Sequence, residues 1–312
     1  MKNLLFFALG MVTLAGLLLV SAYTSPDSLS NPKATTLLSE DAAPDETLVQ
    51  KVSAPPIPDA IDFAGAPLPM DNFDAVERFD RELIANCFRH SATFVYLKRA
   101  NRYFPIIEPI LKAQGMPDDL KYLAVAESGL ANAVSPAGAR GFWQFMPGSA
   151  KDRGLEVNSE IDERYHLEKA TIAACSYLRE AHQDLGDWML AAASYNMGKG
   201  GLKKRLREQK CKAYFDLNLN SETSRYLLRI MALKEIMQHP VRYGFNMTEK
   251  DLYAPLPAHK IVTVKSSVAS WADFAKEHKT SYRMLKVYNP WLRSSSLTNK
   301  YKKTYKIYLP AS

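Results

Sequence analysis

The sequence is poor in cysteine and has no compact metal-binding motif. Its 312 residues include three cysteines, which excludes a scaffold built on disulfides, and neither a CxxC pair nor an HExxH motif occurs. Hydrophobic residues make up 47% of the chain and charged residues 23%, which excludes a wholly disordered or collagen-like protein. We therefore expect a folded protein without a metal or a cofactor. Cys87 and Cys175 lie in apolar helical stretches and are expected to be buried thiols.

The longest apolar run lies at the N-terminus. It extends over residues 4–20, after Lys2 and before the small residues Ser21 and Ala22. This pattern is typical of a secretory signal peptide over residues 1–22. The run also reaches the lower length limit of a membrane span, so a retained N-terminal anchor with membrane association is the alternative. In both cases we expect an exported protein, and nucleic acid is not an expected partner.

Proline and charge divide the remainder into three segments. Residues 23–70 hold eight of the 18 prolines and seven acidic against two basic residues, which predicts an extended acidic linker. Residues 71–257 are nearly neutral, with 26 bases and 24 acids. Residues 258–312 hold 11 bases and two acids. The basic character of the chain therefore belongs to a separate C-terminal module.

Hydrophobic periodicity predicts a mainly α-helical body. Apolar residues recur at helix spacing from residue 73 to residue 111, and Pro117 with two aspartates opens a further helix. Other helices are expected at 166–184, 187–196 and 221–239, with no strand-rich stretch between 71 and 250. In the tail, β-branched or alternating segments at 260–264 and 305–309 enclose two short helical stretches. The fold class is therefore mainly α, with a small βααβ module at the C-terminus.

One carboxylate stands out near the end of an apolar helix. Leu120, Leu123 and Glu127 are spaced i, i+3 and i+7, so they share one helix face, and that face is apolar. Partial burial disfavours the charged form of a carboxylate and raises its pKa toward neutrality. Such an acid can protonate a glycosidic oxygen. Taken by itself, this stretch also allows a glutamate that turns out to solvent.

Three later segments carry polar and aromatic residues suited to a sugar. The loop at 135–147 is punctuated by glycine and holds Ser135, Gln144 and large aromatics, of which Trp143 can equally be core. Residues 193–200 include Tyr195 and Asn196, and residues 221–226 place Glu222 and Tyr226 one helical turn apart. Glu222 can also be a structural acid at a helix start. Glycines 198, 200 and 201 lack the spacing and the preceding strand of a phosphate loop.

These motifs, in this order, resemble the lytic transglycosylases of the soluble (SLT) lysozyme-like superfamily. The resemblance covers roughly residues 90–250 and implies a lysozyme-like SLT domain with an N-terminal helical extension within 71–257. It implies that Glu127 is the catalytic acid/base. Contacts with substrate are implied for Ser135, Gln144, Tyr195, Asn196, Glu222 and Tyr226. Ser194 and Met197 depart from the usual residues beside the Tyr-Asn pair.

The C-terminal segment, residues 260–310, resembles a LysM domain, a βααβ unit that binds N-acetylglucosamine chains. Ser266 and Ser267 stand where the usual Gly-Asp pair would follow the first strand, so no binding residues are transferred. The excess of nine positive charges suits an anionic partner, such as cell-wall polymer or a membrane surface, or is simply a solvated basic surface.

The scarcity of acids around Glu127 bears on the mechanism. Ordinary glycosidases use two carboxylates, yet no Asp or Glu lies between Glu127 and Gln144. Together with the resemblance, this predicts a substrate-assisted reaction that cleaves the N-acetylmuramic acid–N-acetylglucosamine bond of peptidoglycan glycan strands and leaves a 1,6-anhydro sugar. The alternatives are a hydrolase, muramidase or chitinase, on the same fold, or a cell-wall binding protein without activity.

Overall fold

The structure is a computed structural model that describes residues 52–311. The expected signal peptide or anchor, and the linker as far as residue 51, lie outside the described residues. Within the described range, no helix combines the length and the apolar character needed to cross a membrane.

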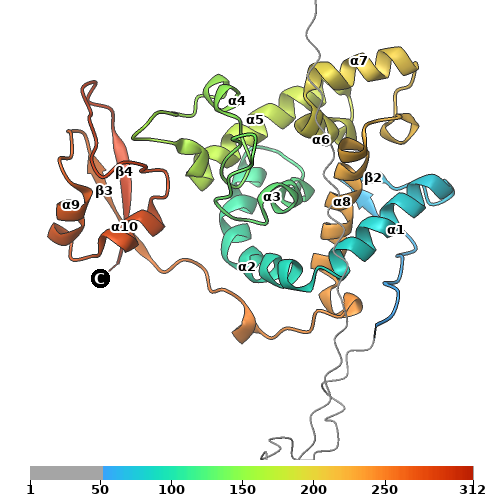
Figure 1. Cartoon of the computed structure of the whole chain (residues 1–312), viewed down its shortest axis with the longest axis horizontal. Coiled ribbons are helices and arrows are strands. Elements are labelled where there is room, and N and C mark those ends of the chain that lie inside the picture. Colours follow the sequence, from blue (N-terminus) through green and yellow to red (C-terminus); the bar gives the residue numbers. More distant parts are fainter. Residues whose placement is uncertain (1–51, 312) are drawn as a thin grey trace, which may run out of the picture. The chain divides into compact units, whose positions relative to one another are not determined.

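Ten α-helices and two small antiparallel sheets form the described part of the chain (Figure 1). The helices are α1 (Phe73–Cys87), α2 (His90–Ala113), α3 (Lys121–Ser128), α4 (Pro147–Asp152), α5 (Leu167–Leu185), α6 (Trp188–Met197), α7 (Lys199–Gln209), α8 (Ser221–Gln238), α9 (Trp271–Glu277) and α10 (Tyr282–Tyr288). The strands are β1 (Asp62–Phe63), β2 (Ala66–Pro67), β3 (His259–Val264) and β4 (Tyr305–Pro310). The prediction of a mainly helical body with a βααβ tail is confirmed.

Local capping explains where several helices begin. Asn72 accepts backbone N–H bonds at the start of α1, and Asn220 does the same for α8. Pro117 precedes a short 3-10 turn, Asp118–Leu120, that leads directly into α3. The sequence patterns predicted these helices within a few residues, but they did not predict α4 or α7.

The segment before α1 differs from the expected linker. Residues 61–68 fold into the β1–β2 hairpin, and the side chains of Ile61, Phe63 and Leu68 are buried in the main core. The prediction of a solvated linker up to residue 70 is therefore wrong for these residues. Burying three large apolar side chains within eight residues stabilises a folded segment, although the prolines around them restrict its backbone.

Helix α8 runs through the centre of the helical body. It packs against α1, α3 and α6, and most of its residues are buried, including Leu227 and Ile230 (Figure 1). Because its surroundings are apolar on several sides, the helix lacks the clear single stripe of a surface helix. The consequence for function is that α8 brings its first turns against the C-terminal end of α3, where Glu127 lies.

The C-terminal module has its own small core and docks onto the body. Strands β3 and β4 pair antiparallel, with Val262 opposite Ile307, and Trp271, Leu285 and Ile307 fill the space under α9 and α10. The body contributes Ile161 to this core, forming a bridge with Leu292. Two backbone bonds cross the contact, Asp162 N to Trp291 O at 2.9 Å and Arg293 N to Glu160 O at 2.7 Å.

Candidate active site

Glu127 lies in the last turn of α3, where the helix ends abruptly. Gly129 ends it in the left-handed conformation, with φ of 60°, and a Cβ atom there would come within 2.3 Å of the Tyr96 ring. Only glycine fits this combination of close approach and positive φ. Leu120 and Leu123, which share the inward face with Glu127, are fully buried. Glu127 itself is half-buried, and its carboxyl reaches the hydroxyl of Tyr226 on α8.

Opposing effects act on the pKa of the Glu127 carboxyl. Burial raises its pKa from 4.5 to about 7, and the negative charge of Glu222 acts in the same direction. The hydrogen bond from Tyr226 and the positive charge of Arg229 act against this rise. The Tyr226 hydroxyl donates to Oε1 of Glu127 at 2.6 Å. A group with this pKa is available both as an acid and as a base near neutral pH.

A cavity of about 210 Å³ opens beside Glu127. Its walls come from the end of α1, the start of α2, α3 with the loop that follows, and α8. The lining residues are Asn86, Arg89, Tyr96, Val125, Ala126, Glu127, Ser128, Gly129, Ala133, Arg229 and Leu233. Glu127 is the one acid among these lining residues. Among the described residues no cluster of three His, Cys, Asp or Glu side chains is placed to hold a metal ion.

Two tyrosines, Tyr195 and Tyr226, lie near enough to Glu127 for its charge to affect their pKa values. Burial raises the pKa of both phenols well above 10, and the charge of Glu127 adds to this. Tyr195 donates to the backbone oxygen of Trp143 at 2.7 Å, which ties α6 to the loop at 135–147. Both hydroxyls therefore remain protonated donors at neutral pH. Trp143 itself is fully buried and donates to Thr171, so its interpretation as core packing is confirmed.

Ser135 and Gln144 do not line the described walls of the Glu127 cavity. The Ser135 hydroxyl accepts a bond from Ala139 N at 3.0 Å, which closes the turn of its own loop. The Gln144 amide donates to the carbonyls of Ala133 and Gly141, and Gln144 has a positive φ of 48°. Ala133 is one of the cavity residues, so Gln144 acts on the site by holding the wall in place.

Asn196 and Glu222 lie around the start of α8. Asn196 accepts a bond from the Thr223 hydroxyl at 2.9 Å and so joins the end of α6 to α8. Glu222 is in the first turn of α8, where the helix dipole stabilises a negative charge. Its side chain is 60% exposed. Although Glu222 and Tyr226 are one turn apart, only Tyr226 is buried.

Arg229 is the main site residue that sequence patterns missed. Its guanidinium lies 3.2 Å from Glu222 Oε1 and 3.5 Å from Glu82 Oε2, and it lines the cavity with Glu127. Glu82, on α1, is only 1% exposed and also pairs with Arg225. Helical spacing was the available signal for Arg229, because Glu222, Tyr226 and Arg229 are i, i+4 and i+7 on α8.

Comparison with known proteins identifies the class of this domain. Residues 104–218 match the family model of the transglycosylase SLT domain, and residues 260–312 match that of the soluble lytic transglycosylase C-terminal LysM-like domain. The protein thus carries a lytic transglycosylase domain of the SLT type. More particularly, it combines this domain with the LysM-like domain found at the C-terminus of soluble lytic transglycosylases.

Individual relatives cover parts of the chain. Membrane-bound lytic murein transglycosylase D of Escherichia coli strain K12 is 29% identical over 205 residues, which are 64% of this chain and 44% of that protein. A putative tributyltin chloride resistance protein of Alteromonas is 29% identical over 123 residues, 39% of this chain and 59% of that protein. The chain therefore spans less than half of the first relative. A solved structure of lytic transglycosylase Slt from Pseudomonas aeruginosa is 20% identical, with a TM-score of 0.38, over 49% of this chain and 26% of that one.

Proposed function

We propose that this protein is a peptidoglycan lytic transglycosylase with Glu127 as its catalytic acid and base. The observation that carries the proposal is the Glu127 carboxyl itself, which is half-buried beside a cavity and bonded to Tyr226, and whose pKa is raised by desolvation to about 7. The matches to the SLT domain and to a murein transglycosylase supply the substrate class. The substrate is the bond between N-acetylmuramic acid and the following N-acetylglucosamine.

In the first step, protonated Glu127 gives its proton to the glycosidic oxygen. The bond from that oxygen to C1 of N-acetylmuramic acid breaks, and N-acetylglucosamine leaves with a free 4-hydroxyl. The oxygen of the substrate's own N-acetyl group stabilises the positive charge at C1. The buried position of Glu127 supports this step because burial keeps the acid protonated near neutral pH.

In the second step, the Glu127 carboxylate takes the proton of the C6 hydroxyl, and O6 forms a bond to C1. This closes the 1,6-anhydro ring, restores the acid and consumes no water. The hydrogen bond from Tyr226 supports the step because it stabilises the carboxylate in the interval between the two proton transfers. We assign Tyr195, Asn196, Ser135 and Gln144 to shaping the sugar-binding cleft, through the bonds that connect α6, α8 and the loop.

The surrounding acids support a mechanism with one carboxylate. Asp119 pairs with Lys234 at 2.7 Å and accepts a bond from Ala64 N, and Asp118 pairs with Lys121. Glu222 is held by Arg229 and is largely exposed. Each of these acids already has a cationic partner, so none is free to act as the second catalytic group of an ordinary glycosidase.

The partner of the protein in this proposal is the glycan strand of peptidoglycan, and its location is the cell envelope. Both domain matches support such a partner. The envelope location also agrees with the apolar run expected to export the chain.

Purified sacculi provide the test. The wild-type chain is expected to release soluble muropeptides, and Glu127→Gln is expected to release none while its circular dichroism spectrum and thermal transition remain those of a folded protein. Near-normal release by Glu127→Gln would contradict the assignment of Glu127 as the catalytic acid and base. A matched control is Glu208→Gln, an exposed acid of α7 paired only with neighbours on its own helix; it should release muropeptides like the wild type.

A further inference from the structure

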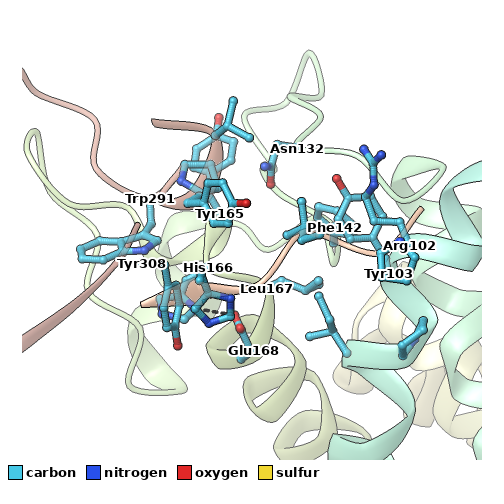
Figure 2. Close-up of a pocket in the computed structure, with 18 residues that line it drawn as sticks. Arg102, Tyr103, Asn132, Phe142, Tyr165, His166, Leu167, Glu168, Trp291 and Tyr308 are labelled. Atoms are coloured by element: carbon cyan, nitrogen blue, oxygen red, sulfur yellow. Dashed lines mark ion pairs between the residues drawn. The ribbon is translucent and has the colours of Figure 1, made fainter. Parts of the chain in front are cut away.

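A short segment of the body, residues 160–165, is held by the C-terminal module. The side chains of Ile161 and Tyr165 are buried in the core of the module, at 1% and 3% exposed. The next residue, His166, stacks on Trp291 of the module at the edge of a cavity between body and module (Figure 2). The two backbone bonds that cross this contact also end on the segment. The module therefore fixes both the position and the conformation of residues 160–165.

On its other side, the same segment holds the loop at 135–147 through Arg164. The guanidinium is 3% exposed, and its Nη1 donates to the backbone oxygens of Gly138 and Phe145, at 3.1 Å each. These two oxygens lie before and after the turn at 141–144. Because a single guanidinium bonds the chain on both sides of the turn, it fixes the shape of the loop as well as its place on the body.

Asp162 compensates the buried charge of Arg164. Its Oδ1 accepts from Arg164 Nε at 2.9 Å, and its Oδ2 accepts from Nη2 at 2.7 Å. Both side chains are 3% exposed, so each would be an unpaired buried charge without the other. The two-point contact fixes the plane of the guanidinium and directs Nη1 toward the loop. Since Asp162 N–H donates to Trp291 O at 2.9 Å, the module determines where this pair lies.

We propose that Asp162 and Arg164 are positioning residues, through which the C-terminal module sets the geometry of the loop at 135–147. Neither residue is among the described lining residues of the cavity beside the catalytic acid, so both act through the loop. The loop carries Ser135 and Gln144, which shape the cleft in the proposed function. The effect on turnover rests on that proposed function, whereas the effect on the order of the loop does not.

Hydrogen exchange of the loop amides tests the positioning without turnover. Arg164→Lys keeps the charge but lacks the planar fork, so it cannot replace all of the bonds of the guanidinium. We expect the amides of residues 135–147 to exchange about tenfold faster in the folded variant than in the wild type, measured by mass spectrometry. Asp162→Asn weakens the same pair and should raise the exchange of the same amides. Unchanged exchange in these folded variants would overturn the proposal.

A matched control is Arg179→Lys. The Arg179 guanidinium also bonds a backbone oxygen, that of Gln114, but at a different place in the body. This variant should leave the exchange of residues 135–147 unchanged. Equal acceleration in Arg179→Lys and Arg164→Lys would mean that the loop responds to any weakening of the body, which would contradict a specific role of Arg164.

Two variants of the module test the route from module to loop. Leu292 is 1% exposed in the core of the module and forms the bridge with Ile161 of the body. Leu285 is fully buried in the same core, on α10. We expect Leu292→Ala to accelerate exchange of the loop amides and Leu285→Ala to leave it unchanged. Equal exchange in the two folded variants would contradict the route through residues 160–165.

Steady-state cleavage of labelled, soluble glycan strands separates positioning from a loss of folded protein. A displaced loop weakens the cleft, so Arg164→Lys should raise KM by about fivefold or more, with a smaller change in kcat. A merely structural role would lower the amount of active protein, so kcat would fall while KM stayed the same, and this would overturn the proposal. Absence of cleavage by the wild type would refute the proposed function instead, and the exchange measurement would still decide the role of Arg164.

Discussion

The hydroxyl of Tyr226 donates a 2.6 Å hydrogen bond to Oε1 of Glu127, across 99 residues of sequence. This bond links the C-terminal end of α3 to the first turns of α8 and places a permanent donor on the only carboxyl that opens into the described cavity. Burial favours the protonated acid, whereas the phenol favours the carboxylate. Because both act on one side chain, the same glutamate can give and then take a proton.

The first prediction concerns the pH dependence of cleavage. In the proposed mechanism the reaction begins with protonated Glu127, whose pKa in the free protein is raised to about 7. We therefore expect kcat/KM for release of muropeptides to fall as the pH rises through about 7. Rates at fixed ionic strength, measured on labelled sacculi, check this. A rate that falls only below pH 5 would mean that ionised, not protonated, Glu127 starts the reaction.

The second prediction concerns Tyr226→Phe. Loss of the hydroxyl removes a stabilising bond to the carboxylate, so the pKa of Glu127 rises. The alkaline limb of the pH profile is expected to move upward by about 1–2 pH units, while kcat falls because the second step needs the carboxylate. Tyr214→Phe is the control, since its buried hydroxyl bonds the backbone of Thr223 instead. An unmoved limb in Tyr226→Phe would contradict the proposed role of the bond.

The third prediction links the same carboxyl to stability. Its pKa is about 7 in the folded chain and about 4.5 when exposed, so the folded state binds the proton more tightly. Stability from this group is complete below pH 4.5 and is lost as the pH rises to about 7. Glu127→Gln has no such loss. Its advantage over the wild type should grow by roughly 3 kcal/mol between these pH values, measured by urea unfolding. A constant difference would contradict the raised pKa.

Features set by local sequence could be predicted, whereas contacts between distant segments could not. Glu127 was predictable because its helix face is local, and the buried Leu120 and Leu123 confirm that face. The contact of Tyr226 with Glu127 and the approach of Arg229 required the packing of α8 on α3, which periodicity does not give. The polar side chain of Gln144 indicated a site but could not reveal that its amide holds the loop backbone.

Composition is a poor guide where a short apolar cluster lies among prolines and acids. Prolines and acids predicted an open linker, yet Phe63 and its neighbours are buried in the core. Helix α7 was missed because its glycines at 200 and 201 and its many lysines give only a weak apolar stripe, with Leu202 as its one fully buried residue. The cavity between body and module had no sequence signal, because it arises only when Trp291 docks beside His166.

The fourth prediction concerns the loop at 135–147, whose Gln144 side chain bonds the cavity residue Ala133. Gly141 has a φ of 82°, and a Cβ atom there would lie 1.9 Å from the backbone oxygen of Arg164. Gly141→Ala should therefore lower the free energy of unfolding by several kcal/mol, roughly 3 or more. Gly138→Ala is the matched control, since it has a φ of 87° and open space around it, and should cost about 1 kcal/mol. Equal losses in thermal unfolding would mean that the close approach to Arg164 has no effect.

The mass of the released sugars tests the central claim most directly. If Glu127 closes the ring with the C6 hydroxyl of the substrate, digestion of sacculi yields muropeptides that end in 1,6-anhydro-N-acetylmuramic acid. By mass spectrometry these are lighter by one water than the products that a muramidase makes from the same sacculi. Products that carry the additional water, with a free reducing end, would show that water attacks C1 and would contradict the single-carboxylate mechanism proposed for this site.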